Sequence, residues 1–195
     1  GALIDVINVG NSSSEPTLRK ALAIGADKAI RIDADPLDGY FVAKQISEYV
    51  KTSSYDLIIA GRESIDYNGA MVPGLIAGFL KINYVTNCTK LEIDNEKVEL
   101  DREIDGGKET LNCTLPLIIG GQKGLVEESD LRIPNMRGIM QARQKPLEVL
   151  EAFDYSSNTK TIKFYKPEPK QAVKLVSADN LDELINLLHN EAKVL

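Results

Sequence analysis

The sequence predicts an α/β fold with a Rossmann-like, mostly parallel sheet that carries helices on both faces. Short apolar runs of strand length recur at residues 4–9, 29–32 and 56–60, and segments with helical spacing of apolar residues separate them. Strands that alternate with helices in this way form βαβ units and a parallel sheet. The 195 residues suffice for one such domain with an appended arm.

The elements of the first half follow from caps and apolar spacing. After the strand at 4–9, Ser12–Ser14 offer N-cap hydroxyls to a helix that Gly25 ends. The strand at 29–32 leads through a turn to a second helix, in which Val42, Ile46, Tyr49 and Val50 share one face. The strand at 56–60 then precedes a polar, glycine-containing turn and a third helix.

The pattern changes in the second half. Apolar and polar residues alternate at 90–93, 97–100 and 110–113, which predicts an antiparallel excursion with one solvated face. A buried strand is expected at 115–119. Little regular pattern follows until 139–145, where we expect a short basic helix.

We therefore divide the chain into a nucleotide-binding α/β domain, residues 1–146, and an arm, residues 147–195. Residues 147–178 lack a period that would build a core, so we expect them to be extended. The arm ends in an amphipathic helix from about Leu181 to Ala192. That helix must bury its apolar face against its own domain or against another subunit, and we expect it to contact a partner subunit.

Composition excludes several classes of function. A net charge of −6 argues against a nucleic-acid partner, and no apolar run is long enough for insertion into a membrane. His189 is the only histidine, which argues against a His-based triad and against a multi-histidine metal site. Cys88 and Cys113 lack metal or redox spacing and are expected to be inert thiols. We expect no catalytic residues and no metal, hence a binding protein and not an enzyme.

The segment GRESIDYNGAMVPG, residues 61–74, lies between an apolar strand and an apolar helix. N–H groups at a helix amino terminus attract anions, so this turn is a candidate phosphate site. It contains neither a Walker A loop nor the dinucleotide fingerprint. A turn of this composition also occurs without any ligand, and Asp66 could simply satisfy N–H groups of its own loop. Spacing alone leaves both interpretations open.

A second candidate surface is the segment LRIPNMRGIMQARQKP, residues 131–146. It places Ile133, Pro134 and Met136 in a loop, followed by a helix with several basic residues. Exposed apolar groups beside positive charge are typical of a partner-docking surface. The alternative is that Ile133 and Met136 are buried under their own loop.

Three stretches together resemble the beta subunit of electron transfer flavoprotein. They are AGRESIDYNGAMVPG at 60–74, REIDGGKETLNCTLPLII at 102–119 and RIPNMRGIMQARQKPLEV at 132–149, and ALAIGADKAIRI at 21–32 also fits the family. The resemblance covers essentially the whole chain. It also implies that the sequence begins at the family's second strand, so that about 50 residues of the family's chain have no counterpart here.

The resemblance implies a heterodimer in which an alpha subunit holds most of an FAD, while the beta subunit binds AMP and supports the flavin. In electron-bifurcating relatives a second FAD replaces the AMP. Such complexes take electrons from acyl-CoA dehydrogenases and other dehydrogenases and pass them to a membrane quinone oxidoreductase. This implies a location in the bacterial cytoplasm, or in the mitochondrial matrix of a eukaryote.

The family's nucleotide loop corresponds to Gly61–Val72, and Val9 is expected near the adenine. The expected cofactor-binding residues are thus Val9, Gly61, Arg62, Ser64, Ile65, Asp66, Tyr67, Asn68, Gly69, Ala70, Met71 and Val72. Because Ala70–Val72 replace polar residues of the family, the phosphate would be held mainly by backbone N–H groups and by Ser64 or Asn68. The expected partner-docking residues are Ile133, Pro134, Met136, Arg137, Ile139 and Met140, with Met136 as the apolar anchor.

Two other classes compete with this interpretation. One is an adenine-nucleotide-binding α/β enzyme or stress-type sensor domain of the same fold. The other is a scaffold that binds no nucleotide.

Overall fold

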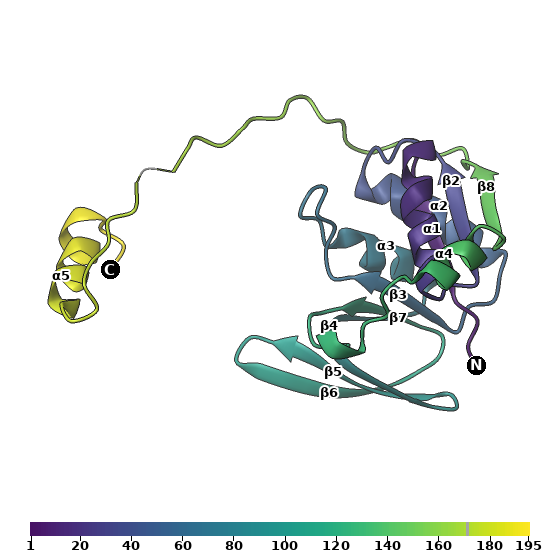
Figure 1. Ribbon diagram of the computed structural model, residues 1–195, viewed down its shortest axis with the longest axis horizontal. Helices are drawn as coiled ribbons and strands as arrows, with labels where there is room; N and C mark the ends of the chain where they lie inside the picture. Colours follow the sequence, from purple (N-terminus) through teal and green to yellow (C-terminus); the bar gives the residue numbers. More distant parts are fainter. Residues whose placement is uncertain (171) are drawn as a thin grey trace. The chain divides into compact units, whose positions relative to one another are not determined.

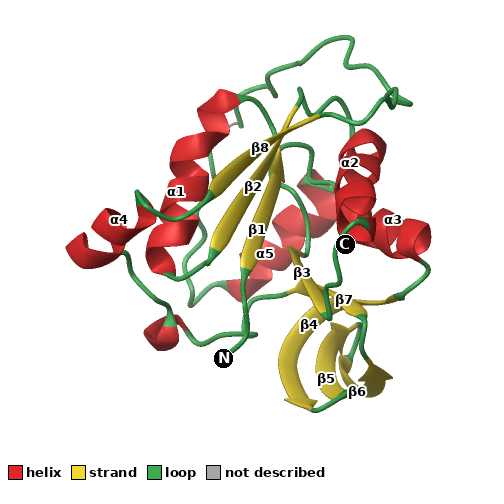
Figure 2. Ribbon diagram, turned by 90° about the vertical axis from the view of Figure 1, so that its right-hand side faces the viewer, coloured by secondary structure: helices red, strands yellow, loops and turns green. Residues whose placement is uncertain are grey.

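The computed structural model describes residues 1–170 and 172–195, which form two units, Gly1–Lys160 and Thr161–Leu195. A parallel sheet in the first unit has the strand order β1-β2-β8, with β1 at Asp5–Val9, β2 at Lys28–Asp33 and β8 at Leu147–Glu151 (Figures 1 and 2). Two helices, α1 (Glu15–Ile24) and α2 (Gly39–Lys51), follow β1 and β2 in the chain. A short 3-10 turn, η1 (Ser12–Ser14), precedes α1.

Alternation along the strands gives this sheet two covered faces. Ala29 of β2 packs with Leu18 and Leu22 of α1, whereas Ile30 and Ile32 pack with residues of α2 such as Phe41. Successive side chains of a strand point to opposite faces, so one strand contributes to both clusters. The prediction of a parallel sheet with helices on both faces is confirmed.

A second sheet has the order β3-β7-β4-β5-β6. Its strands are β3 (Leu57–Gly61), β4 (Asn83–Asp94), β5 (Lys97–Ile104), β6 (Gly107–Thr114) and β7 (Leu117–Gly121). Strand β7 pairs in parallel with β3 and with the start of β4, while β5 pairs antiparallel with β4 and β6, as the alternating pattern predicted. Strand β4 is longer than predicted, because an irregularity between Cys88 and Lys90 lets it leave β7 and continue beside β5.

The two sheets are linked through their helices. Helix α3 (Met71–Leu80) contributes Ile76 and Ala77 to a cluster with Ala43 of α2 and Ile118 of β7. In the described ranges, β1 pairs only with β2 and β3 pairs only with β7, so each has one open edge. The predicted strand at 56–60 is therefore only partly buried, and Ile59 is 61% exposed.

Two expectations for the carboxyl-terminal part were wrong. Residues 147–151 are not extended arm but strand β8, because the backbone pairs with β2 in the register Ala29↔Leu147. The short helix α4 spans Met136–Ala142 and begins earlier than predicted, since the Asn135 side chain caps it by accepting from Gly138 N. Met136 therefore starts a helix and does not lie in the preceding loop.

The remaining helical elements are short. A 3-10 turn, η2 (Glu128–Asp130), precedes α4, and the second unit contains α5 (Leu181–Asn186), which continues as a π-helical turn, η3 (Leu187–Glu191). This confirms the predicted carboxyl-terminal helix. Among the helices of the described residues, none combines the length and apolar character required to cross a bilayer.

Candidate nucleotide site and docking surface

The loop between β3 and α3 is closed by its own hydrogen bonds. Ser64 N donates to Gly69 O at 2.8 Å, and Ser64 Oγ donates to Asp66 Oδ2 at 2.8 Å. Asn68 adopts a left-handed φ of 49°, which lets the chain turn back at this point. The Ser64 hydroxyl, which we expected to face a phosphate, is thus engaged with Asp66 inside the loop. Ile65 and Tyr67 project outward and are 92% and 57% exposed.

The amino terminus of α3 is open. Its N-cap is Ala70, which makes no side-chain cap hydrogen bond, and Pro73 has no N–H group to offer. The N–H groups of Met71 and Val72 therefore have no acceptor on the N-cap side chain, and they lie at the positive end of the helix dipole. This donor set fits an anionic group such as a phosphate.

The amino terminus of the neighbouring helix α2, in contrast, is capped by a side chain. Asp38 caps it, with Oδ1 accepting from Phe41 N at 2.7 Å. The two helix starts lie close together, because a Cβ on Gly39 would lie 2.8 Å from the Met71 sulfur. Of these two adjacent helix amino termini, only that of α2 carries a carboxylate cap, so an anion is better accommodated at α3.

The basic side chain of this loop is that of Arg62. Its Nη2 lies 2.7 Å from Glu63 Oε1, and both side chains are 44% exposed. Arg62 N donates to Gly121 O, which ties the start of the loop to the end of β7. The guanidinium is accessible at the rim of the loop, but Glu63 already offsets part of its charge.

Val9 lies at the carboxyl end of β1 and is 5% exposed. It packs in the core with Ile30 and Ile32, so its side chain is mainly structural in this chain. The adjacent Asn8 has a buried Oδ1 without a hydrogen-bond partner among the described residues. A Cβ on Gly10 would lie 2.7 Å from that oxygen, which places it directly beneath the loop that follows β1.

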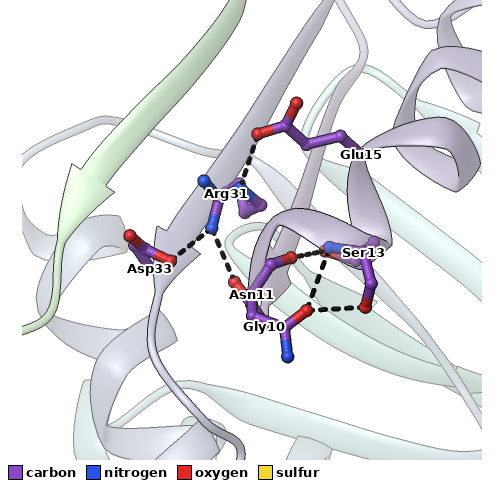
Figure 3. Close-up of polar contacts among 7 residues, drawn as sticks. Gly10, Asn11, Ser13, Glu15, Arg31 and Asp33 are labelled. Carbon is purple, nitrogen blue, oxygen red and sulfur yellow. Dashed lines mark hydrogen bonds and ion pairs between the residues drawn. The ribbon is translucent and has the colours of Figure 1, made fainter.

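The structure adds one polar centre that the sequence analysis did not single out. Arg31 of β2 is 5% exposed and donates to Gly10 O, Glu15 Oε1 and Asp33 Oδ1, as Figure 3 shows. The hydrogen bond from Arg31 to Asp33 raises the pKa of the guanidinium by more than burial lowers it, so the pKa of Arg31 lies above its ordinary value. A charged residue between Ile30 and Ile32 was the signal available in the sequence. Arg31 joins the loop after β1 to the end of β2.

The docking candidates remain accessible. Ile133, Met136 and Met140 are 82%, 75% and 66% exposed, and Ile139 is 41% exposed. Pro134 and Arg137 are exposed as well. Within the described residues the two apolar side chains of the loop, Ile133 and Met136, are therefore not buried beneath it.

Comparison with known proteins decides the family. A family model described as "Electron transfer flavoprotein domain" matches residues 1–154. The chain is also 37% identical over 209 aligned residues to the electron transfer flavoprotein subunit beta of Bacillus subtilis (strain 168), covering 100% of this chain and 80% of the relative. The chain belongs to the electron transfer flavoprotein beta-subunit family.

Other members of the electron transfer flavoprotein beta-subunit family show the same relation. A mitochondrial beta subunit from Oryza sativa subsp. indica is 33% identical over 206 residues, covering 100% of this chain and 79% of the relative. A beta subunit from Sus scrofa is 28% identical over 195 residues, covering 96% of this chain and 75% of the relative. Members of the family are electron carriers and not catalytic enzymes, and a beta subunit implies an alpha-subunit partner. The family has bacterial and mitochondrial members.

Proposed function

We propose that this protein binds AMP, or a second FAD, and supports the FAD held by the alpha subunit of a heterodimer. The complex would carry electrons from acyl-CoA dehydrogenases and other dehydrogenases to a quinone oxidoreductase and so towards the respiratory chain. It would act in the bacterial cytoplasm, or in the mitochondrial matrix if the source is eukaryotic. The single observation that carries the nucleotide assignment is the open amino terminus of α3 directly after β3.

The chemistry of that terminus suits a nucleotide phosphate. The ends of parallel strands and the helix starts that follow them are the usual phosphate position in such sheets. The N–H groups of Met71 and Val72 would hold the phosphate, and the remaining residues of the Gly61–Val72 loop would surround the nucleotide. Bound FAD would supply the redox chemistry, whereas the residues of this chain bind and orient.

The arm and α5 would contact the alpha subunit. Ile162, Phe164 and Leu175 of the second unit are 96%, 77% and 90% exposed. Exposed apolar side chains of this size favour burial against another chain. Contact with the alpha subunit would cover them.

The identity of the nucleotide tests the proposal directly. The intact complex of alpha and beta subunits is denatured, and the released nucleotides are separated by chromatography and quantified by absorbance. We expect one AMP for each FAD, or two FAD if the second site holds a flavin. A single FAD without any AMP would refute the nucleotide assignment.

A charge at the N-cap of α3 tests the position of the phosphate. Ala70→Asp should stabilise the helix and at the same time repel and replace the phosphate, so AMP content should fall about tenfold. Ala70→Asn competes for the same N–H groups without a charge and should have a smaller effect. Equal AMP content in Ala70→Asp and the parent would place the phosphate elsewhere.

A further inference from the structure

Helix α4, which carries Met136 and Met140, lies against α1 (Figures 1 and 2). The approach is close, because a Cβ on Gly138 would lie 2.4 Å from Ala23 O. Ala142, at the end of α4, is 3% exposed and packs in the cluster of Leu18 and Leu22. The side of α4 that faces α1 is therefore buried.

Two basic residues, one in α1 and one in the turn after α4, connect the two helices through hydrogen bonds. Arg19 Nη1 of α1 donates to Ala142 O and to Lys145 O, each at 2.8 Å. In return, Lys145 Nζ donates to Leu22 O at 3.1 Å and to Ala26 O at 2.6 Å. We call this arrangement of Arg19 and Lys145 the reciprocal clasp.

Each cation of the reciprocal clasp contacts one carbonyl in the last turn of a helix, Ala142 O of α4 or Leu22 O of α1, and one carbonyl just beyond that helix. The last carbonyls of a helix have no partner within it and form the negative end of its dipole. Arg19 and Lys145 are half-buried, so their hydrogen bonds are partly shielded from water. The clasp thus satisfies both helix ends and fixes their relative position.

A helix of seven residues depends on such contacts. In isolation α4 would not be stable, because short helices in water are dominated by the cost of nucleation. Its exposed side carries Met136, Ile139 and Met140, whose apolar groups cannot hold it in place in water. Contacts with α1 must therefore hold α4 in position.

We propose that Arg19 and Lys145 are positioning residues for partner docking. The reciprocal clasp holds α4 in its binding geometry before the partner arrives, so that the ordering cost at the interface is already met. Arg19 and Lys145 act through α4 and need not touch the partner. This inference rests on the proposed function, to which it adds that the dehydrogenase docks on the exposed surface around Met136 that the sequence predicts for partner docking.

The test uses the intact complex of alpha and beta subunits. Arg19→Gln and Lys145→Gln each remove one half of the clasp, Arg19→Lys and Lys145→Arg keep the charge, and Lys20→Gln removes a neighbouring exposed charge from α1. Hydrogen–deuterium exchange of residues 136–142 reports the order of α4. Steady-state kinetics of a purified acyl-CoA dehydrogenase, with the complex as electron acceptor, report docking. Flavin content and circular dichroism establish that each variant is folded.

We expect each Gln variant to increase amide exchange in α4 about tenfold, as the loss of two hydrogen bonds predicts. The apparent KM for the complex should rise about fivefold while kcat changes less than about twofold, because ground-state docking is affected and not electron transfer. The charge-conserving variants should return both values to within about twofold of the parent. Lys20→Gln should leave amide exchange unchanged.

Other results would overturn the inference in distinguishable ways. If the Gln variants leave exchange in α4 unchanged, the clasp does not position the helix, whereas docking through Met136 stays supported if Met136→Ala raises KM. If exchange rises but KM does not, α4 need not be ordered for docking. If Met136→Ala also leaves KM unchanged, the docking function itself fails. An equal rise of KM in Lys20→Gln would assign the effect to long-range charge.

Discussion

Arg31 illustrates at the scale of one residue how a charge is accommodated in an apolar strand. Its guanidinium faces α1 and satisfies a backbone carbonyl and two carboxylates. Glu15 and Asp33 remain partly solvated, with side chains 39% and 56% exposed, so the burial cost falls mainly on Arg31 itself. The residue connects β2 with the loop that follows β1.

Replacement of Arg31 by methionine should destabilise the protein. The change leaves Gly10 O without its donor and removes the cation that both Glu15 and Asp33 contact, at a cost of about 2 kcal/mol in the free energy of unfolding. Urea denaturation of the complex measures this. Lys28→Met is the matched control on the same strand, because the Lys28–Glu148 pair is partly exposed and contributes less than about 1 kcal/mol. Equal effects of the two variants would contradict the structural role of Arg31.

Met136 gives a second prediction at this scale. Met136→Ala should leave the flavin content unchanged but slow electron uptake from a dehydrogenase, because an apolar anchor buried by a partner contributes about 2 kcal/mol. Stopped-flow reduction of the complex at subsaturating dehydrogenase measures the rate. Val126→Ala removes an apolar side chain that is 55% exposed outside this surface and should have no effect. Unchanged kinetics in Met136→Ala would remove the anchor assignment.

The sequence allowed some features of the candidate site to be predicted, but not the long-range contacts of individual residues. The turn after β3 was recognisable, because a glycine-containing polar segment between two apolar runs has a local signature. The hydrogen bond between Ser64 and Asp66 was anticipated only as a general alternative. The contacts of Arg31 with Gly10 and Glu15, and those of Arg19 and Lys145, could not be predicted, since these partners are remote in sequence and depend on the packing of α1.

At the scale of the element, α2 depends on Asp38 in two ways. Its Oδ1 caps the helix, while its Oδ2 accepts from Asn158 N at 2.7 Å, Thr159 N at 2.8 Å and Thr159 Oγ1 at 3.1 Å. The first contact stabilises the helix start. The others attach the segment after β8 to the same helix.

The two oxygens of Asp38 can be tested separately. Asp38→Asn should keep the cap through its remaining oxygen but release residues 158–159, whose amides should exchange faster with solvent. Asp38→Ala should lose both contacts and about 1 kcal/mol more of stability. Hydrogen exchange and urea denaturation distinguish the variants. If residues 158–159 stay protected in Asp38→Asn, the carboxylate is not what holds them.

The same carboxylate predicts a dependence on pH. Burial raises the pKa of Asp38, but hydrogen bonds from Phe41, Thr159 and Asn158 lower it by more, so the folded pKa lies below the ordinary value of 3.8. The stabilisation is therefore complete above pH 3.8 and is lost as the pH falls through the lower folded pKa. Asp38→Ala should abolish this contribution to acid unfolding, which titration of stability at low pH measures. An identical acid transition in parent and variant would contradict it.

The boundaries of elements show where local patterns are insufficient. The antiparallel excursion was predictable, because alternation over its strands is clear. Strand β8 was not, because LEVLE is short and gains its structure from pairing with β2. Helix α4 began early because an asparagine cap outweighed the weak apolar spacing.

At the scale of the whole molecule, the chain divides into two units, with the boundary along the sequence between Lys160 and Thr161. Trypsin should cut the isolated beta chain first after the exposed Lys163, leaving the first unit intact. Lys108, which is exposed but paired within β6, should resist and serves as the internal control. Association with the alpha subunit should protect Lys163, and mass spectrometry of the fragments checks both outcomes. Cleavage at an unchanged rate in the complex would argue against contact of the arm with the alpha subunit.

The fold class and the family were both accessible from the sequence, for different reasons. Strand and helix periods are local and predict a parallel sheet. The family rested on three separated stretches whose combination no single period explains. The division of strands between two sheets was not predictable, because it depends on which edges find partners in three dimensions.

The contacts of Asp38 with Asn158 and Thr159 also have a mechanical consequence. A pulling force applied through the second unit reaches this junction before it reaches β8, because Thr159 directly precedes Lys160 in the chain. The three hydrogen bonds on one carboxylate oxygen would then carry the load first and yield first. Rupture of these hydrogen bonds would release a few residues before Lys160 while the sheet stays intact. The contacts of Asp38 would therefore protect the first unit from unfolding under a small pulling force.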